Sequence, residues 1–220
     1  MRRFSDRHEA GRILAGELER FAHVPDVVVL GLPRGGVVVA FEVARALDAP
    51  LDVFVVRKLG VPGHEELAAG AIAGGGVMVV NDDVVNGAGL SRAQIELIAK
   101  GEWVVLEQRE KLYREHSVKA EVGGRIAILV DDGLATGATM RTAVAALRQL
   151  EPSRIVVAVP TAPRETCDVL AREADEMVCS MTPYPFFSVG EWYDDFAQTS
   201  DDEVVSLLER AGGFGRRVDR

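Results

Sequence analysis

Two adjacent carboxylates, Asp131 and Asp132, are the side chains whose type and position in this sequence best suit a chemical role. They directly follow five apolar residues, Ile126–Val130, a run that is typical of a buried parallel strand. Carboxylates at such a strand end accept hydrogen bonds from the vicinal hydroxyls of a sugar, or bind a metal ion. The alternative interpretation is a solvated acidic turn between a strand and a helix.

A loop of small residues follows the acidic pair and leads into a helical apolar pattern. The loop residues are Ala135, Thr136, Gly137, Ala138 and Thr139. Because these side chains have little bulk, the backbone N–H groups can approach an anion closely. The first N–H groups of a helix also lack partners and suit a phosphate. Together, the carboxylates and the loop predict a site for a ribose 5-phosphate.

A second glycine-rich loop follows an earlier apolar run, Val27–Leu30, and opens another helical pattern. The loop reads Gly31, Leu32, Pro33, Arg34, Gly35 and Gly36. Its glycines allow close backbone approach, and the planar guanidinium of Arg34 suits phosphate oxygens. A tight turn that merely requires glycine explains this loop equally well when it is considered alone.

Arg57 and Lys58 place two cations at the end of a predicted strand, Leu51–Val56. In a chain of net charge −9, paired cations at a strand end favour a role in binding a polyphosphate. The alternative is a solvated basic strand end.

The run 126–139 resembles the phosphoribosyl-pyrophosphate (PRPP) motif of type I phosphoribosyltransferases: an apolar strand, two acidic residues and a small Thr/Gly phosphate loop. The resemblance implies that Asp131 and Asp132 contact the ribose hydroxyls and that Ala135–Thr139 hold the 5-phosphate. The run matches neither a Walker P-loop nor the G-x-G-x-x-G fingerprint of a dinucleotide-binding oxidoreductase.

The same resemblance assigns the other two motifs to pyrophosphate. In the family, a loop at the position of residues 32–36 holds the pyrophosphate, often through a non-prolyl cis peptide. Arg57 and Lys58 would then meet the pyrophosphate oxygens. The segment 60–76, which follows them, lies where the family usually has a mobile loop that closes over the reaction.

An aromatic-rich segment near the end of the chain resembles the hood of 6-oxopurine members of the family. The hood is expected at 181–198, and it carries a Phe-x-Val-Gly sequence followed by an aspartate. By resemblance, Phe187 stacks on the base, Val189 lines its pocket and Asp194 faces magnesium. Those enzymes have an aspartate at the position of Ala135, where this chain resembles adenine-type members, so the acceptor base stays open.

The apolar runs and helical patterns alternate, which predicts an α/β fold with a parallel twisted sheet and helices on both faces. We expect one domain, 1–220, with the hood and a helical insertion at 91–116 that has a possible break near Gly101. Further strands are expected at Val77–Val80, Arg154–Val159 and Glu176–Ser180, with Pro160 stopping the second of them. Further helices are expected at Arg7–Phe21, Glu165–Ala174 and Asp201–Ala211, and Asp201 is the expected N-cap of the last helix. The element at Leu67–Ile72 is of uncertain type. Ligands of such sheets bind beyond the carboxyl ends of the strands, near the switch in strand order.

Composition narrows the possible partners. The net charge argues against nucleic acid or an anionic membrane surface as a partner. No apolar stretch approaches the roughly 18 residues that span a bilayer. Two cysteines do not form a disulfide framework, and a cytoplasmic location is expected.

These features predict a Mg²⁺-dependent phosphoribosyltransferase, acting as a homodimer. It would transfer the 5-phosphoribosyl group of PRPP to a nucleobase, with purine favoured, or to a related acceptor, and release pyrophosphate. Its catalytic residues would be Asp131, Asp132, Arg57 and Lys58. The alternative is a non-catalytic regulatory protein that senses PRPP or a nucleotide on the same fold.

Overall fold

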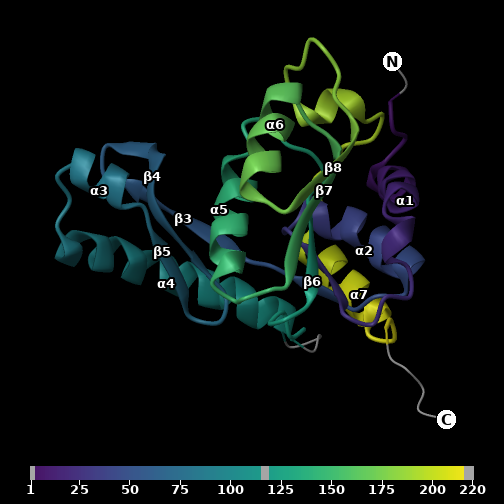
Figure 1. Cartoon of the computed structure of the whole chain (residues 1–220), viewed down its shortest axis with the longest axis horizontal. Coiled ribbons are helices and arrows are strands. Elements are labelled where there is room, and N and C mark those ends of the chain that lie inside the picture. Colours follow the sequence, from purple (N-terminus) through teal and green to yellow (C-terminus); the bar gives the residue numbers. More distant parts are fainter. Residues whose placement is uncertain (1–2, 115–118, 216–220) are drawn as a thin grey trace.

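A five-stranded parallel sheet forms the centre of the computed structural model, which describes residues 3–114 and 119–215 (Figure 1). Its strands lie in the order β2, β1, β6, β7, β8. Their bounds are β1 (Val27–Gly31), β2 (Leu51–Val53), β6 (Ile126–Val130), β7 (Arg154–Thr161) and β8 (Glu176–Met181). All four neighbouring pairs are parallel, as the continuous apolar runs predicted.

Helices cover both faces of this sheet. On one face, Val29, Ile128 and Val156 pack with α1 (Arg7–Glu17), α2 (Gly35–Leu47) and α7 (Asp201–Ala211). On the other, Val28, Leu129 and Val157 pack with α5 (Ala138–Arg148) and α6 (Arg164–Glu173). Successive strand residues point to opposite faces, so strands covered on both faces, such as β1 and β6, must be apolar throughout. The predicted α/β class with a sheet covered on both faces is confirmed.

A second sheet, which the sequence did not predict, projects from the first together with α3 (Asp82–Gly87) and α4 (Arg92–Arg114) (Figure 1). It is antiparallel and consists of β3 (Val56–Val61), β4 (His64–Ala73) and β5 (Val77–Val80). The segment 60–76 is therefore largely a hairpin and not an irregular loop. Left-handed glycines make both turns: Gly63 in the first, and Gly75 and Gly76 in the second.

The strand expected at Leu51–Val56 ends earlier than predicted. The parallel strand β2 stops at Val53, where the N–H of Phe54 donates to the carbonyl of Gly31. The chain then enters β3 of the second sheet, so Arg57 and Lys58 lie within an antiparallel strand and not at a parallel strand end. The apolar residues 53–56 continue without interruption across the change of sheet, so they gave no sign of it.

The helical insertion is one unbroken helix, so the possible break at Gly101 is wrong. A capping box begins the helix: the Ser91 N–H donates to Gln94 Oε1, and the Gln94 N–H donates to Ser91 Oγ. The buried side chains Ile95, Ala99, Leu106 and Tyr113 fix one face against the rest of the protein. Residues 115–116 of the expected helix lie outside the described residues.

Other predicted ends also differ. The helix expected at Arg7–Phe21 ends at Glu17, and a 3₁₀ helix follows at Glu19–Phe21. β7 continues through Pro160 to Thr161 because its pairing with β6 ends at Ala158, and a residue without an N–H is tolerated where one neighbour is missing. The N-cap of α7 is Ser200, whose side chain accepts from the Glu203 N–H, and not Asp201. None of the helices in the described part of the chain is long and apolar enough to cross a membrane.

Replacing Gly101 by alanine is expected to stabilise the protein by about 1 kcal/mol, the difference in helix propensity. A Cβ at Gly101 would meet no heavy atom within 4 Å. Chemical denaturation measures the change. Gly76→Ala is the matched control: its Cβ is equally uncrowded, but its φ of +81° makes alanine strained, so it should destabilise. Destabilisation by Gly101→Ala would contradict the continuous helix.

Candidate active site

The site lies where the chain reverses its order across the sheet. β1 and β6 are neighbours, but the chain continues from β1 to β2 on one side and from β6 to β7 on the other. The loops that follow β1 and β6 therefore diverge at a switch point, where open α/β sheets bind ligands. The N–H of Leu32 donates to the carbonyl of Val130 at 2.9 Å, which joins the glycine loop to the end of β6.

The glycine loop and the acidic pair are in direct contact. A Cβ at Gly36 would lie 2.8 Å from both the Asp131 Cα and the Val130 carbonyl oxygen. A Cβ at Gly35 would collide with the Asp132 carboxylate. Glycine is thus required here for close approach between two loops, which a tight turn alone would not demand. The Pro33–Arg34 peptide of this loop is cis.

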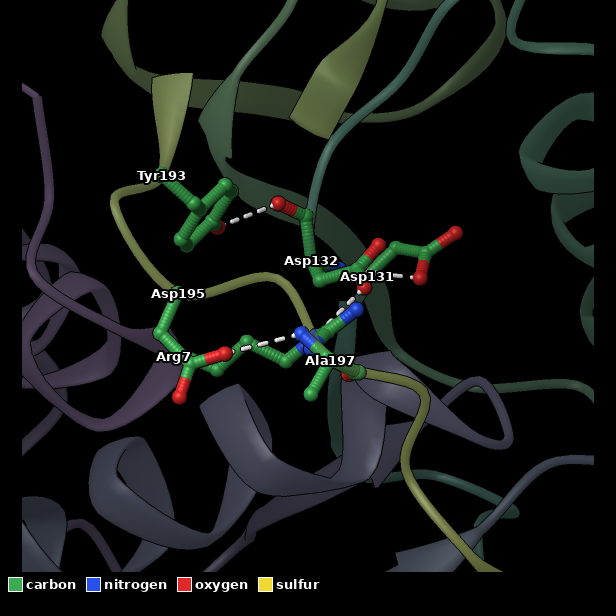
Figure 2. A network of polar contacts seen from close by, with 6 residues as sticks. All are labelled: Arg7, Asp131, Asp132, Tyr193, Asp195 and Ala197. Atoms are coloured by element: carbon green, nitrogen blue, oxygen red, sulfur yellow. Dashed lines mark hydrogen bonds and ion pairs between the residues drawn. The ribbon is translucent and has the colours of Figure 1, made fainter. Parts of the chain in front are cut away.

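Arg7, at the start of α1, is the cation that the acidic pair meets (Figure 2). Its Nε donates to Asp132 Oδ2 at 2.7 Å, and both side chains are largely buried, with 11% and 16% of their surface exposed. The N–H of Asp132 donates to Asp131 Oδ1 at 2.9 Å, so the two carboxylates are held at fixed positions relative to each other.

Burial and mutual repulsion make the pair difficult to ionise. The pKa of Asp131 is well above its usual range because the carboxyl is desolvated and the charge of Asp132 lies beside it. Burial also raises the pKa of Asp132, although the hydrogen bond and charge of Arg7 oppose that rise. A site that holds excess negative charge favours ligands that bring hydroxyl donors or a cation.

The last part of the hood, residues 192–197 (the strap), is tied to this centre and pairs with Phe4. The Phe4 N–H donates to the carbonyl of Trp192, and the N–H of Asp194 donates back to the carbonyl of Phe4. The Tyr193 hydroxyl donates to the carbonyl of Asp132 at 2.5 Å (Figure 2). Residues far apart in the sequence thus meet at the acidic pair.

Arg7 extends the same connection further along the hood. Its Nη1 donates to the carbonyl of Ala197 at 2.8 Å, and its Cζ lies 3.9 Å from the centroid of the Phe196 ring. Sequence reasoning missed Arg7. The available signal was its position in the first turn of a helix, where the dipole disfavours a cation unless an anion lies nearby.

The phosphate loop precedes α5 as predicted. Gly137 is its N-cap residue, with a left-handed φ of 72°, and Thr136 Oγ1 accepts weakly from the Ala138 N–H at 3.4 Å. The hydroxyl of Thr166 donates to the carbonyl of Ala135, which holds the loop against α6. Ala138 and Thr139 are exposed at the start of the helix, where the N–H groups can meet an anion.

The structure separates the two cations that the sequence placed together. Arg57 pairs with Glu102 of α4 at 2.6 Å. Lys58, the next residue along the strand, lines a cavity of about 850 Å³ between the second sheet and α5, which Ala138 also lines. Adjacent strand residues face opposite sides. Lys58 is thereby brought towards the phosphate loop and Arg57 towards α4.

The predicted hood residues are also separated. Val189 is half-buried, and a Cβ at Gly133 would lie 2.5 Å from its Cγ1, so Val189 adjoins the acidic turn. Phe187 is 77% exposed. Asp194 is exposed on the strap. The described residues contain no group of three His, Cys, Asp or Glu side chains that could hold a metal.

Two buried polar atoms beneath the hood were not predicted as site atoms. Thr161 Oγ1 and Trp192 Nε1 have no hydrogen-bond partner within the part of the chain that the structure describes. Thr161 ends β7, and its Cγ2 would lie 3.1 Å from a Cβ at Gly133. Buried polar groups are normally paired, so these two atoms are available to a ligand or water.

The fold and the arrangement of these loops point to the phosphoribosyl transferase family. The model of the phosphoribosyl transferase domain matches residues 8–195, and the chain belongs to that family. The crystal structure of TT1426 from Thermus thermophilus is similar with a TM-score of 0.89 and 42% identity, covering 96% of this chain and all of that one.

Two curated relatives come from strains of Mycobacterium tuberculosis. They are Rv0571c of strain H37Rv and MT0597 of strain CDC 1551, both provisionally named as phosphoribosyl transferases. Each is 50% identical to this chain over 211 residues, or 96% of the chain. The chain spans 47% of the length of each relative.

Asp131→Asn should raise the free energy of unfolding at neutral pH. Because folding raises the pKa of Asp131, the folded state binds its proton more tightly, and wild-type stability falls as the pH rises from the ordinary pKa towards the raised one. The neutral amide removes this loss, worth about 1 kcal/mol per pKa unit. The gain should therefore be present at pH 7 and shrink below pH ~4, as thermal denaturation across pH can measure. Asp168→Asn, at an exposed ion pair, is the control and should give no such trend.

Arg7→Met should destabilise the protein by about 2 kcal/mol, the contribution of a hydrogen bond between charged groups. It should also speed hydrogen exchange at the amides of Asp194 and Asp195, because the strap loses the link that Arg7 makes between Ala197 and Asp132 and keeps only that of Tyr193. Arg12→Met, at an exposed position of the same helix, should change neither quantity. Equal effects of the two substitutions would contradict the role of Arg7.

Proposed function

We propose that the protein transfers the 5-phosphoribosyl group of PRPP to a nucleobase or related acceptor and releases pyrophosphate. The observation that supports this most strongly is the contact between the glycine loop and the acidic pair at the switch point. A ligand that spans that contact and the start of α5 needs a diol between two phosphate groups, and PRPP has that arrangement.

The donor is positioned by groups that are already fixed. The ribose hydroxyls donate to Asp131 and Asp132, and the N–H groups at the start of α5 hold the 5-phosphate. The backbone of residues 32–36 approaches the pyrophosphate, with Arg34, Arg57 and Lys58 as its cations. Because Arg7 and the Asp132 N–H fix the carboxylates before binding, little ordering is required when the sugar arrives.

In the reaction, the bond between C1 of the ribose and the pyrophosphate oxygen breaks, and pyrophosphate leaves with the electron pair. A bond from C1 to the acceptor forms through a transition state with oxocarbenium character. The carboxylates beside the ribose stabilise the positive charge that develops on the sugar, and the cations and backbone N–H groups stabilise the leaving group.

Mg²⁺ is the proposed cofactor, and the residues present suit it. Burial raises the pKa of both Asp131 and Asp132, and the charge of Asp132 raises that of Asp131 further, so a divalent cation between them would favour their charged forms. Mg²⁺ usually takes one or two carboxylates, with substrate phosphates and water completing its shell, so a third protein ligand is not required. When bound, it would neutralise the pyrophosphate as this group leaves. Asp194, on the strap beside the acidic turn, is the further carboxylate proposed to face it.

A purine is the favoured acceptor, held beneath the hood. Val189 adjoins the acidic turn there, and Thr161 and Trp192 offer a hydroxyl and an N–H for hydrogen bonds with a heterocycle. Phe187 would have to turn inwards to stack on the base. The homodimer stays a prediction, which light scattering after size-exclusion chromatography tests directly.

The second candidate is a regulatory protein that binds PRPP or a nucleotide without turnover. The glycine loop, acidic pair and phosphate loop serve binding in either case, and no described side chain is a clear general base for the acceptor. A panel of nucleobases assayed for pyrophosphate release from PRPP separates the two. Ligand-dependent stabilisation without pyrophosphate release would favour the regulator.

Asp131→Asn combined with Asp132→Asn should abolish PRPP binding, measured by calorimetry with Mg²⁺, while the protein stays folded. Gly101→Ala is a control that should bind PRPP like the wild type. Unchanged PRPP affinity in the double variant would overturn the proposed function.

A further inference from the structure

The proposed reaction assigns no role to α4, yet this helix is connected to both arginines that the sequence assigned to pyrophosphate. Arg57 pairs with Glu102, which is part of α4. Arg34 pairs with Asp201, which accepts a hydrogen bond from Tyr113 at the other end of α4. The helix lies along the second sheet and reaches α7, where Asp201 is the first residue.

The contact to Arg57 is close and geometrically fixed. Arg57 Nε donates to Glu102 Oε2 at 2.7 Å, and its Nη2 lies 2.6 Å from the same oxygen. The buried residues Ile95, Ala99 and Leu106 hold α4 in place on either side of Glu102. A phosphate oxygen that reaches Arg57 must therefore compete with a carboxylate that the fold holds against it.

The contact to Arg34 is made through two residues. Arg34 Nη1 lies 3.8 Å from Asp201 Oδ2, and the Tyr113 hydroxyl donates to Asp201 Oδ1 at 2.5 Å. Tyr113 is 1% exposed, and burial together with Asp201 raises its pKa, so its hydroxyl remains a donor. Because the hydroxyl donates a hydrogen bond to the Asp201 carboxylate, it weakens the electrostatic attraction between Asp201 and the Arg34 guanidinium.

We propose that Glu102 and Asp201 are internal counter-ions that hold Arg57 and Arg34 in place and set the affinity for pyrophosphate. Each guanidinium gives up part of a carboxylate contact when it binds a phosphate oxygen, so the net gain from binding is reduced. A leaving group that is held too tightly would slow turnover. α4 is then the element that positions the cations. This inference rests on the proposed function.

An ordinary surface ion pair would behave differently. All four side chains are about one-third to one-half exposed, and such pairs commonly add little to stability. If they were only structural, neutralising a carboxylate would leave ligand affinity unchanged, or would weaken every ligand equally through misfolding. A selective increase in pyrophosphate affinity distinguishes the proposal from both cases.

The test is calorimetric titration of pyrophosphate with Mg²⁺, and separately of ribose 5-phosphate, into the full chain. Glu102→Gln and Asp201→Asn should each tighten pyrophosphate binding about fivefold, a typical coupling between sites. Ribose 5-phosphate affinity should stay within about twofold, because its phosphate binds at α5. Glu96→Gln removes a carboxylate from the same helix at an exposed pair with Arg92, and should change neither affinity.

Tyr113→Phe should have the opposite sign. Without the hydroxyl, the charge of Asp201 acts more strongly on Arg34, so pyrophosphate should bind more weakly than in the wild type. Combined with Asp201→Asn, the Tyr113→Phe change should have no further effect, because the carboxylate through which it acts is gone. Thermal denaturation of each variant confirms that it is folded.

The outcomes separate the two proposals. If the wild type binds pyrophosphate and the Glu102→Gln and Asp201→Asn variants bind it no more tightly than Glu96→Gln, the counter-ion inference is wrong and the proposed function stands. If the wild type binds neither pyrophosphate nor ribose 5-phosphate, the proposed function is wrong, and this inference falls with it.

Discussion

The site depends on the close approach of two loops at the centre of the parallel sheet. Because β1 and β6 are neighbours with Gly31 opposite Val130, the chain segments that follow them start side by side. Only glycine at position 36 allows the first loop to reach the backbone of Asp131. That contact places the start of α2 against the acidic turn. The helices on both faces of the sheet, the strap and the second sheet are arranged around this contact.

Charge is the second constraint on this arrangement. Burying Asp131 beside Asp132 disfavours ionisation, and Arg7 offsets part of that cost from outside the motif. The guanidinium also binds the hood through Ala197 and Phe196. The donor centre and the predicted acceptor pocket are therefore not independent, since one arginine contacts both. A family motif at Ile126–Thr139 gives no indication of this connection.

The second sheet and α4 extend the site away from the parallel core. Their apolar face is continuous with the core of α1, α2 and α7, so α4 is a fixed part of the structure. Its Glu102 pairs with Arg57, and its Tyr113 is hydrogen-bonded to Asp201, which pairs with Arg34. Two of the cations proposed for pyrophosphate, Arg34 and Arg57, are thus connected to a helix outside the PRPP motif, and family resemblance alone could not assign that role.

The sequence by itself determined the central strands, the fold class and the two loops at the carboxyl ends of β1 and β6. These follow from local patterns: buried parallel strands are apolar throughout, and glycine or small residues are needed where backbone approaches backbone or phosphate. Only the tertiary structure decided which side chains meet. Arg7 reaches Asp132 across 125 residues, and Lys58 parts from Arg57 because adjacent residues of β3 face opposite sides. The change of sheet after Val53 has no local signal, since its apolar residues suit either sheet. The acidic pair was therefore recognisable from sequence, but its counter-ion, the strap and the role of α4 depended on long-range packing.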